Sequence, residues 1–252
     1  MSVVALPNVR ERSLDLPDGL LPIPERIDCP PEDAPLQYLA LSIPCYTWVS
    51  TQFFNVMVLL VKRHPAPIDL AVTMGVYLVH AMRTMMETLA EHPGWQRLLV
   101  VEQDMLIPED ALRKHAQHTV DIVGSMYFQH TFPFHANVLY RHPQKGIVCP
   151  PEPAFVQHMV ENPGLWKCDS VGFGCTSIAR RVFESWDYDI PIWRSEESKT
   201  EAGHDTWFCS RAKEQGFQSY LDSSILCKHL TEHPINYNDY VAANNLDGTN
   251  HG

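Results

Sequence analysis

The sequence predicts an α/β fold in which a doubly wound, mostly parallel sheet carries helices on both faces, with a smaller subregion in the second half. Short apolar runs alternate with amphipathic stretches between residues 36 and 101, and strands that alternate with helices in this way build parallel sheets. The chain has 252 residues, of which 45% are hydrophobic. This is enough for one large domain with its own core.

Three strands open the predicted sheet. Residues 37–44 (QYLALSIP) predict a buried strand, residues 68–75 (IDLAVTMG) a second strand and residues 97–101 (RLLVV) a third. Ligands bind such sheets beyond the carboxyl ends of the strands. The third strand delivers Glu102 to that edge.

Helices are expected between and after these strands. Residues 47–64 are mostly apolar and end in KRH, cations suited to a helix C-terminus. A second helix is indicated by apolar residues at helical spacing, Leu78, Met82, Met85 and Leu89. Residues 108–110 (PED) then open a third helix with the proline and acids favoured in a first turn.

The second half of the chain has a looser pattern. Residues 121–129 (DIVGSMYFQ) predict a further strand, 172–186 (GFGCTSIARRVFESW) a strand leading into a helix, and 204–217 (HDTWFCSRAKEQGF) a helix. Proline- and histidine-rich loops separate these segments.

Three regions are expected along the chain. Residues 1–36 are rich in proline and acids and predict an extended arm, with a disordered leader as the alternative. Residues 37–234 form the domain, with halves at 37–130 and 131–234, and residues 235–252 form a polar tail.

Charge and cysteine usage exclude some classes of protein. The formal net charge is -11, which argues against generic binding to nucleic-acid backbones or anionic membranes. The seven cysteines contain no CxxC pair, so we expect reduced thiols. With no basic segment before an apolar run at the N-terminus, and no apolar run long enough to span a bilayer, we expect a cytoplasmic protein without a membrane partner.

Glu102 and Asp104 are the first candidates for chemistry. In extended backbone the two side chains project to the same side, with Cα atoms about 6 to 7 Å apart. Two such carboxylates can hold one hard cation, which completes its shell with phosphate oxygens and water. The alternative is that the acids only solvate a loop that leads into a helix.

The wider pattern resembles the family-2-like glycosyltransferases with a GT-A fold, a Rossmann-like nucleotide-diphospho-sugar transferase fold, over most of residues 38–230. Four landmarks follow one another in the family's order: YLALSIPCY at the first strand, VVEQDMLIPEDAL at the acidic motif, VGFGCTSIARRVFE at the glycine-containing acceptor segment and HDTWFCSRAKEQGFQSYLDSSILCKH at the catalytic helix. The chain departs from the family in two places. Glu102 stands where Asp is commoner, and His204 stands where a Glu often precedes the catalytic Asp.

The resemblance implies a metal and donor site. Asp104 would bind the metal directly, Glu102 would help through the ribose or a metal-bound water, and His229 would supply another ligand. We favour Mn²⁺ over Mg²⁺ because neutral imidazole suits Mn²⁺ better. The alternative for His229 is a histidine that closes a strand.

The resemblance also implies a general base. Asp205 would take the proton from an acceptor hydroxyl that attacks the anomeric carbon from the opposite face, which inverts the configuration. GHD at residues 203–205 precedes an amphipathic run, which suits a base at a helix N-terminus. Alternatively, Asp205 only caps that helix.

Weaker candidates complete the expected site. Ser42 and Pro44 would line the nucleotide pocket, and Arg83 would lie near the base or diphosphate or be a solvated helix residue. On the acceptor side, beside His204, the resemblance implies a turn formed by Gly172, Phe173 and Gly174. There the backbone would approach the sugar closely, or form only a tight turn. Sugars or bases could also stack on tryptophans, although core packing is the alternative for each: Trp166, Trp193 and Trp207.

The expected activity is metal-dependent transfer of a sugar, from a UDP-sugar by preference, to a hydroxyl acceptor. Protein, glycan, lipid-linked sugar and hydroxylated DNA base all stay open as acceptors, in a bacterial or phage setting, and nucleic acid enters only in that role. Two alternatives are a nucleotidyltransferase and a catalytically silent binding protein of this fold. The segment SIPCYTWVS has neither the glycines nor the basic residue that a nucleotidyltransferase loop needs, and a binding protein has no need of Glu102, Asp104, Asp205 and His229 together.

Overall fold

The computed structural model describes residues 24–45, 49–74, 94–142, 148–186, 203–230 and 236–244. The helix expected around residues 78–89, with Arg83 on it, and Trp193 lie outside these residues. The strands are β1 (Arg26–Ile27), β2 (Leu39–Cys45), β3 (Ile68–Met74), β4 (Arg97–Val101), β5 (Met105–Leu106), β6 (Ile122–Met126), β7 (Val138–Arg141), β8 (Val148–Cys149), β9 (Leu165–Cys168), β10 (Ser170–Val171), β11 (Cys175–Ala179), β12 (Ser219–Leu226) and β13 (Lys228–His229). The helices are α1 (Thr51–Arg63), α3 (Ala111–Gln117), α4 (Pro153–Glu161), α5 (Arg180–Glu184), α6 (His204–Glu214) and α7 (Tyr237–Ala243).

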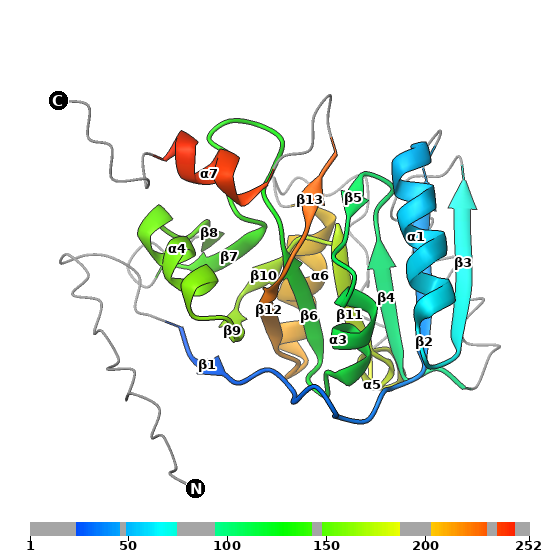
Figure 1. Cartoon of the computed structure of the whole chain (residues 1–252). Coiled ribbons are helices and arrows are strands. Elements are labelled where there is room, and N and C mark those ends of the chain that lie inside the picture. The colour runs from blue at the N-terminus through cyan, green and yellow to red at the C-terminus, as the bar shows by residue number, and fades with distance from the viewer. Residues whose placement is uncertain are drawn as a thin grey trace, which may run out of the picture.

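The main sheet has the strand order β1-β9-β12-β6-β11-β4-β2-β3 (Figure 1). Strands β3, β2 and β4 are parallel neighbours, and so are β6 and β12. Strand β11 lies antiparallel between β4 and β6, and β9 is antiparallel to both β12 and β1. The α/β class is therefore correct. Six of the eight strands point the same way, as expected for a mostly parallel sheet, and β9 and β11 run against them, which makes the sheet mixed.

The reversed direction of β11 follows from the path of the chain. Beyond β6 the chain leaves the main sheet and forms the three-stranded sheet β10-β7-β8 and helix α4. On the way it adds β9 near one edge of the main sheet, and it enters the middle of that sheet at Cys175, beside the carboxyl end of β4, where Cys175 pairs with Val101. A strand that starts at this edge must run back across the sheet.

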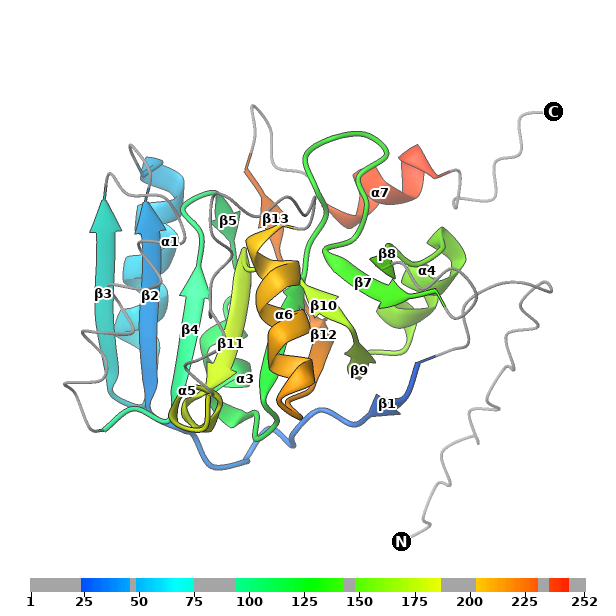
Figure 2. The ribbon, with the colours of Figure 1, turned by 180° about the vertical axis from the view of Figure 1, so that it is seen from behind.

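Hydrophobic cores fill both faces of the sheet, because successive side chains of a strand point to opposite faces. Leu99 of β4 packs with α1 and α3 on one face, and Leu98 packs with α5 and α6 on the other. Figures 1 and 2 show these two helical layers from their own sides. No helix in the described part of the chain is long and apolar enough to cross a membrane.

The segment 24–36 runs extended along the α3 side of the domain. Helix α3 holds it through Gln117, whose Nε2 donates to the carbonyl oxygens of Glu32 at 2.7 Å and Ala34 at 3.2 Å. Within the expected polar tail, residues 236–244 contain α7, and Tyr240 of this helix is buried against Phe128 with ring centroids 4.6 Å apart. All seven cysteines are free thiols.

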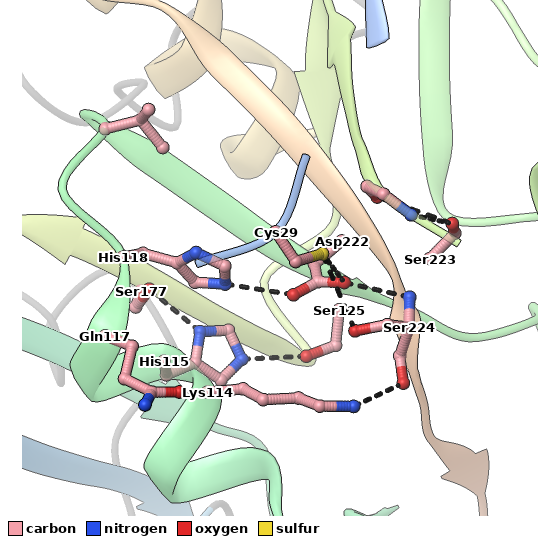
Figure 3. A network of polar contacts seen from close by, with 12 residues as sticks. Cys29, Lys114, His115, Gln117, His118, Ser125, Ser177, Asp222, Ser223 and Ser224 are labelled. Carbon is pink, nitrogen blue, oxygen red and sulfur yellow. Dashed lines mark hydrogen bonds and ion pairs between the residues drawn. The ribbon is translucent and has the colours of Figure 1, made fainter. Parts of the chain in front are cut away.

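A buried polar network joins α3 to the sheet (Figure 3). Nε2 of His118 lies 3.0 Å from Oδ2 of Asp222, and the two ring nitrogens of His115 each lie 2.8 Å from a serine hydroxyl, of Ser177 and Ser125. Burial lowers the pKa of His118, although the hydrogen bond to Asp222 opposes this shift. Burial alone would raise the pKa of Asp222, but hydrogen bonds from His118 and Ser224 outweigh it and hold that pKa below its usual value. The network therefore contains a neutral imidazole and an ionised carboxylate.

This network predicts a loss of stability in acid. The folded-state pKa values of His118 and Asp222 are both depressed, so the unfolded chain binds these protons more readily. The contribution of His118 is present above its unfolded pKa of about 6.5 and declines as the pH falls below it, whereas that of Asp222 is lost at lower pH. Carboxyl groups elsewhere whose pKa is raised act in the opposite direction, but they are common to wild type and His118→Gln. We therefore expect the thermal midpoint of the wild type to fall relative to that of His118→Gln, which has no imidazole to protonate, when the pH is lowered from 7 to 5. Equal changes in both proteins would contradict this assignment.

Candidate functional site

Two short segments bring Asp104 and His229 together at the carboxyl edge of β4. Strand β5 pairs antiparallel with β13, so that Met105 lies opposite His229. The backbone N–H of Leu230 donates to the carbonyl oxygen of Asp104 at 2.6 Å. Residues 125 positions apart in the chain therefore share one corner of the fold.

His229 lies between two acceptors. Its Nδ1 lies 3.0 Å from the carbonyl oxygen of Phe128, and its Nε2 lies 3.2 Å from Oδ2 of Asp104. Because a carbonyl oxygen can only accept, Nδ1 carries a proton and Nε2 is the nitrogen that a metal would use. Burial alone would lower the pKa of His229, but the hydrogen bond and charge of Asp104 outweigh it and raise that pKa above 6.5.

Glu102 follows β4 directly and lies beside the same corner. Its backbone N–H donates to the carbonyl oxygen of Gly174 at 2.9 Å. Burial, and then the negative charges of Asp104 and Asp205, raise the pKa of Glu102 to about 7, while His229 acts in the opposite direction. The carboxyl group of Glu102 is therefore held where its ionised form is poorly stabilised.

Asp205 comes to the site from the first turn of α6. Its Oδ1 accepts the backbone N–H of Thr206 at 2.7 Å, and burial raises its pKa despite this bond. The residue before the helix has to be small, because a Cβ at Gly203 would lie 2.7 Å from Oδ1 of Asp205. Sequence reasoning placed Asp205 at a helix N-terminus, and the structure has it there.

A cavity of about 250 Å³ opens beside Asp205. It is lined by Tyr127, Gln129, Ala136, Asn137, Leu139, Ser170, Gly172, Gly203, Asp205 and Thr206. Apart from Asp205 these groups are uncharged hydroxyls, amides, short apolar side chains and backbone. The cavity therefore offers hydrogen bonds to a neutral ligand next to one carboxylate.

The donor atoms at this corner fit a divalent cation in one respect. Oδ1 of Asp104 is buried and has no hydrogen-bond partner among the described residues, and an unsatisfied buried carboxylate oxygen is costly unless a cation or donor reaches it. Within the described part of the chain, no three His, Cys, Asp or Glu side chains are already arranged around a common metal position. Substrate oxygens and water would have to complete the shell, as they do for Mg²⁺ and Mn²⁺.

The other expected site residues have the following positions. Ser42 and Pro44 are buried near the carboxyl end of β2, and Oγ of Ser42 has no hydrogen-bond partner among the described residues. Phe173 packs in the core against Phe208, with ring centroids 5.4 Å apart. His204 is the first residue of α6, beside Asp205.

Of the candidate tryptophans, Trp166 lies in the core and Trp207 is half-buried. Trp166 is buried, and its Nε1 donates to Oγ of Ser223 at 3.1 Å. Trp207 carries the guanidinium of Arg211 over its ring, 5.0 Å from the centroid.

Glu102, Asp104, Asp205 and His229 are together called the acidic corner below. Sequence reasoning missed Tyr127, which lines the cavity and contacts this corner. Its hydroxyl accepts the backbone N–H of Gly174 at 3.1 Å, and its ring stands edge-on to His229 with centroids 5.6 Å apart. Burial, followed by the charge of Glu102, raises the pKa of Tyr127 well above its usual value, so the phenol stays neutral. One signal was available, because Tyr127 directly follows β6 at the same edge of the sheet.

Tyr127 also fills the space that Gly172 and Gly174 leave open. A Cβ at Gly172 would lie 2.2 Å from the hydroxyl oxygen of Tyr127, and one at Gly174 would lie 2.8 Å from Cζ of the same ring. These glycines therefore leave room for the phenol. The expectation was that they let a sugar approach the backbone.

This packing predicts the cost of adding a methyl group. We expect Gly172→Ala and Gly174→Ala each to destabilise the fold by about 1 to 3 kcal/mol, because the ring is buried and cannot move aside freely. Gly164→Ala is the control, since its Cβ would meet only the side chain of Arg26, which is 38% exposed. Chemical denaturation measures all three, and equal stabilities would refute the packing argument.

Comparisons with known proteins place the fold. The chain superposes on A197 from STIV with a TM-score of 0.54 and 17% identity, over 78% of this chain and 86% of that one. A crystal structure of GalNAc-T7 with UDP, GalNAc and Mn²⁺ gives a TM-score of 0.47 and 8% identity, over 84% of this chain and 48% of that one. The inositol-1-phosphate CTP transferase from T. maritima gives a TM-score of 0.43 and 8% identity, over 84% of this chain and 98% of that one. No protein-family model and no curated protein matches the sequence. At these identities the likeness to A197 shows a shared α/β fold, and the two lower scores support no conclusion about activity.

Proposed function

We propose that this chain transfers a sugar from a nucleotide-diphosphate donor to a hydroxyl acceptor with the help of a divalent cation. One observation carries the proposal. Three carboxylates and a histidine, from segments far apart in the sequence, act on one another at one edge of the sheet: Glu102, Asp104, Asp205 and His229.

The electrostatics of this group favour a ligand site over a purely structural cluster. Burial, and after it the like charges of Asp104 and Asp205, make the ionised form of Glu102 unfavourable and raise its pKa to about 7. Perturbed carboxyl groups beside a cavity are typical of functional sites. A bound cation would relieve the repulsion and satisfy Oδ1 of Asp104, which has no partner among the described residues.

Each side chain has a role in this proposal. Asp104 and Nε2 of His229 would hold the cation directly, and Glu102 would act through the ribose or a metal-bound water. The carbonyl oxygen of Phe128 fixes the tautomer of His229 that this requires. When bound, the cation supplies Lewis-acid neutralisation of the diphosphate leaving group. We favour Mn²⁺ because one ligand is an imidazole.

Asp205 would be the general base. It lies in the wall of the 250 Å³ cavity, where an acceptor hydroxyl would reach it. Burial raises its pKa, which makes its carboxylate a stronger base than an exposed one. The hydroxyl would attack the anomeric carbon from the face opposite the diphosphate and pass its proton to Asp205, while the bond from the sugar to the diphosphate breaks. The nucleoside diphosphate would leave, and the configuration would be inverted.

Ligand-induced stabilisation tests the donor class. We expect UDP with Mn²⁺ to raise the thermal midpoint of the wild type, because a ligand that binds only the folded state stabilises it. The same ligands should leave Asp104→Ala unchanged. A response to ATP with Mg²⁺ alone would favour a nucleotidyltransferase instead, and a response to UDP that needs no metal would refute the cation site.

A further inference from the structure

Tyr127 touches two sides of the acidic corner: Gly174, which is bonded to Glu102, on one side and His229 on the other. It also lines the cavity beside the corner. Its side chain is 8% exposed, and its backbone is fixed by Asn137, whose Oδ1 accepts the N–H of Tyr127 at 2.9 Å. The N–H of Asn137 donates in return to the carbonyl oxygen of Tyr127 at 3.0 Å. The phenol therefore projects from a rigid base.

The hydroxyl of Tyr127 reaches Glu102 through a single residue. Gly174 donates its N–H to this hydroxyl at 3.1 Å, and its carbonyl oxygen accepts the N–H of Glu102 at 2.9 Å. The position of Glu102 at the end of β4 is thus tied to the phenol. Because Gly174 has no side chain, the ring can pack directly on its backbone.

The ring of Tyr127 supports the other half of the corner. It meets His229 edge-on, with an interplanar angle of 84°, and His229 in turn lies 3.2 Å from Asp104. The same ring forms a wall of the cavity that Asp205 lines. Loss of the hydroxyl alone should affect the Glu102 side, whereas loss of the ring should affect both sides.

We propose that Tyr127 is a positioning residue, which holds Glu102 through Gly174 and His229 through ring contact at a set separation from Asp205. This role rests on the proposed function, since it concerns the geometry of that site. Tyr127 acts through the residues that it places.

The test compares Tyr127→Phe with Tyr140→Phe. Tyr140 is also buried, and its hydroxyl donates to Sδ of Met159 at 3.6 Å, so its substitution controls for the loss of a buried phenolic hydroxyl. Amide hydrogen exchange of the peptide segment with Gly174, measured without any ligand, should become at least tenfold faster in Tyr127→Phe only. For Mn²⁺-dependent hydrolysis of a UDP-sugar, we expect kcat to fall at least tenfold in that variant, with KM changed less than threefold.

Each outcome decides one claim. Unchanged exchange at Gly174 would overturn the positioning role whatever the activity. Faster exchange with an unchanged kcat would overturn it too, because the contact would then serve the fold alone. No hydrolysis and no Mn²⁺ binding in the wild type would overturn the proposed function, and with it the role of Tyr127 in that reaction, while the exchange data would still report the contact itself.

Discussion

Replacing Asp104 with alanine should weaken Mn²⁺-dependent binding of a nucleoside diphosphate by about two orders of magnitude or more, because loss of a group that only supports a metal ligand already costs about 10- to 100-fold. The substitution removes Oδ1, which is buried and lacks a partner among the described residues, and it removes the acceptor for Nε2 of His229. Glu102 is a poor replacement, because burial, the largest cause of its raised pKa, still disfavours its ionised form in the variant. Isothermal titration with UDP in the presence and absence of Mn²⁺ measures the effect.

The control for this substitution is Asp110→Asn. Asp110 is an acid six residues further on, at the start of α3, where it pairs with Lys114 at 2.8 Å and makes no cap hydrogen bond. The substitution Asp110→Asn changes the net charge in the same direction as Asp104→Ala but leaves the acidic corner intact. Equal losses of affinity in the two variants would mean that total charge, rather than Asp104, governs binding.

The second large effect is expected from Asp205→Asn. The amide of asparagine has the same shape as the carboxylate, but it cannot take the proton from the acceptor hydroxyl. Loss of a positioned base costs about 10²- to 10⁴-fold in rate. Donor affinity should change less than threefold, since Asp205 lies in the acceptor cavity and affects Glu102 less than burial and Asp104 do. Steady-state kinetics of sugar transfer, with direct titration of the donor, separate the two quantities.

Asp169→Asn provides the matched comparison. Asp169 pairs with Lys213 near the far end of α6 and does not itself line the cavity, so its substitution perturbs the same helix without removing a group from the cavity wall. A loss of transfer in both variants would indicate damage to α6 as a whole. A weakened donor affinity in Asp205→Asn would contradict its assignment to the acceptor side.

Hydrophobic patterning predicted the first strands and helix closely. The expected strand at 37–44 is β2 at Leu39–Cys45, and the expected helix at 47–64 contains α1 at Thr51–Arg63. These elements have apolar residues in long runs or at regular spacing, and such patterns can be recognised from the local sequence alone. The structure has Ser42 and Pro44 near the carboxyl end of β2, as the sequence suggested. Their role in a nucleotide pocket stays a prediction.

The direction of a strand and the pairing of very short strands could not be predicted in the same way. The segment of β11 was recognised, but its antiparallel direction depends on where the chain re-enters the sheet. Strands β5 and β13 have two residues each, too few for any period, yet their pairing is what joins Asp104 to His229. Positions 172 and 174 need glycine because the ring of Tyr127 packs there, and Tyr127 is more than forty positions away in the chain.

The central claim is that Asp104 and Asp205 serve different steps of one metal-dependent sugar transfer. A panel of nucleotide sugars, incubated with Mn²⁺ and assayed for release of nucleoside diphosphate, tests it most directly with wild type, Asp104→Ala and Asp205→Asn side by side. We predict turnover of at least one donor by the wild type only, with donor binding retained in Asp205→Asn and lost in Asp104→Ala. Turnover that is independent of metal and survives Asp104→Ala would contradict the account.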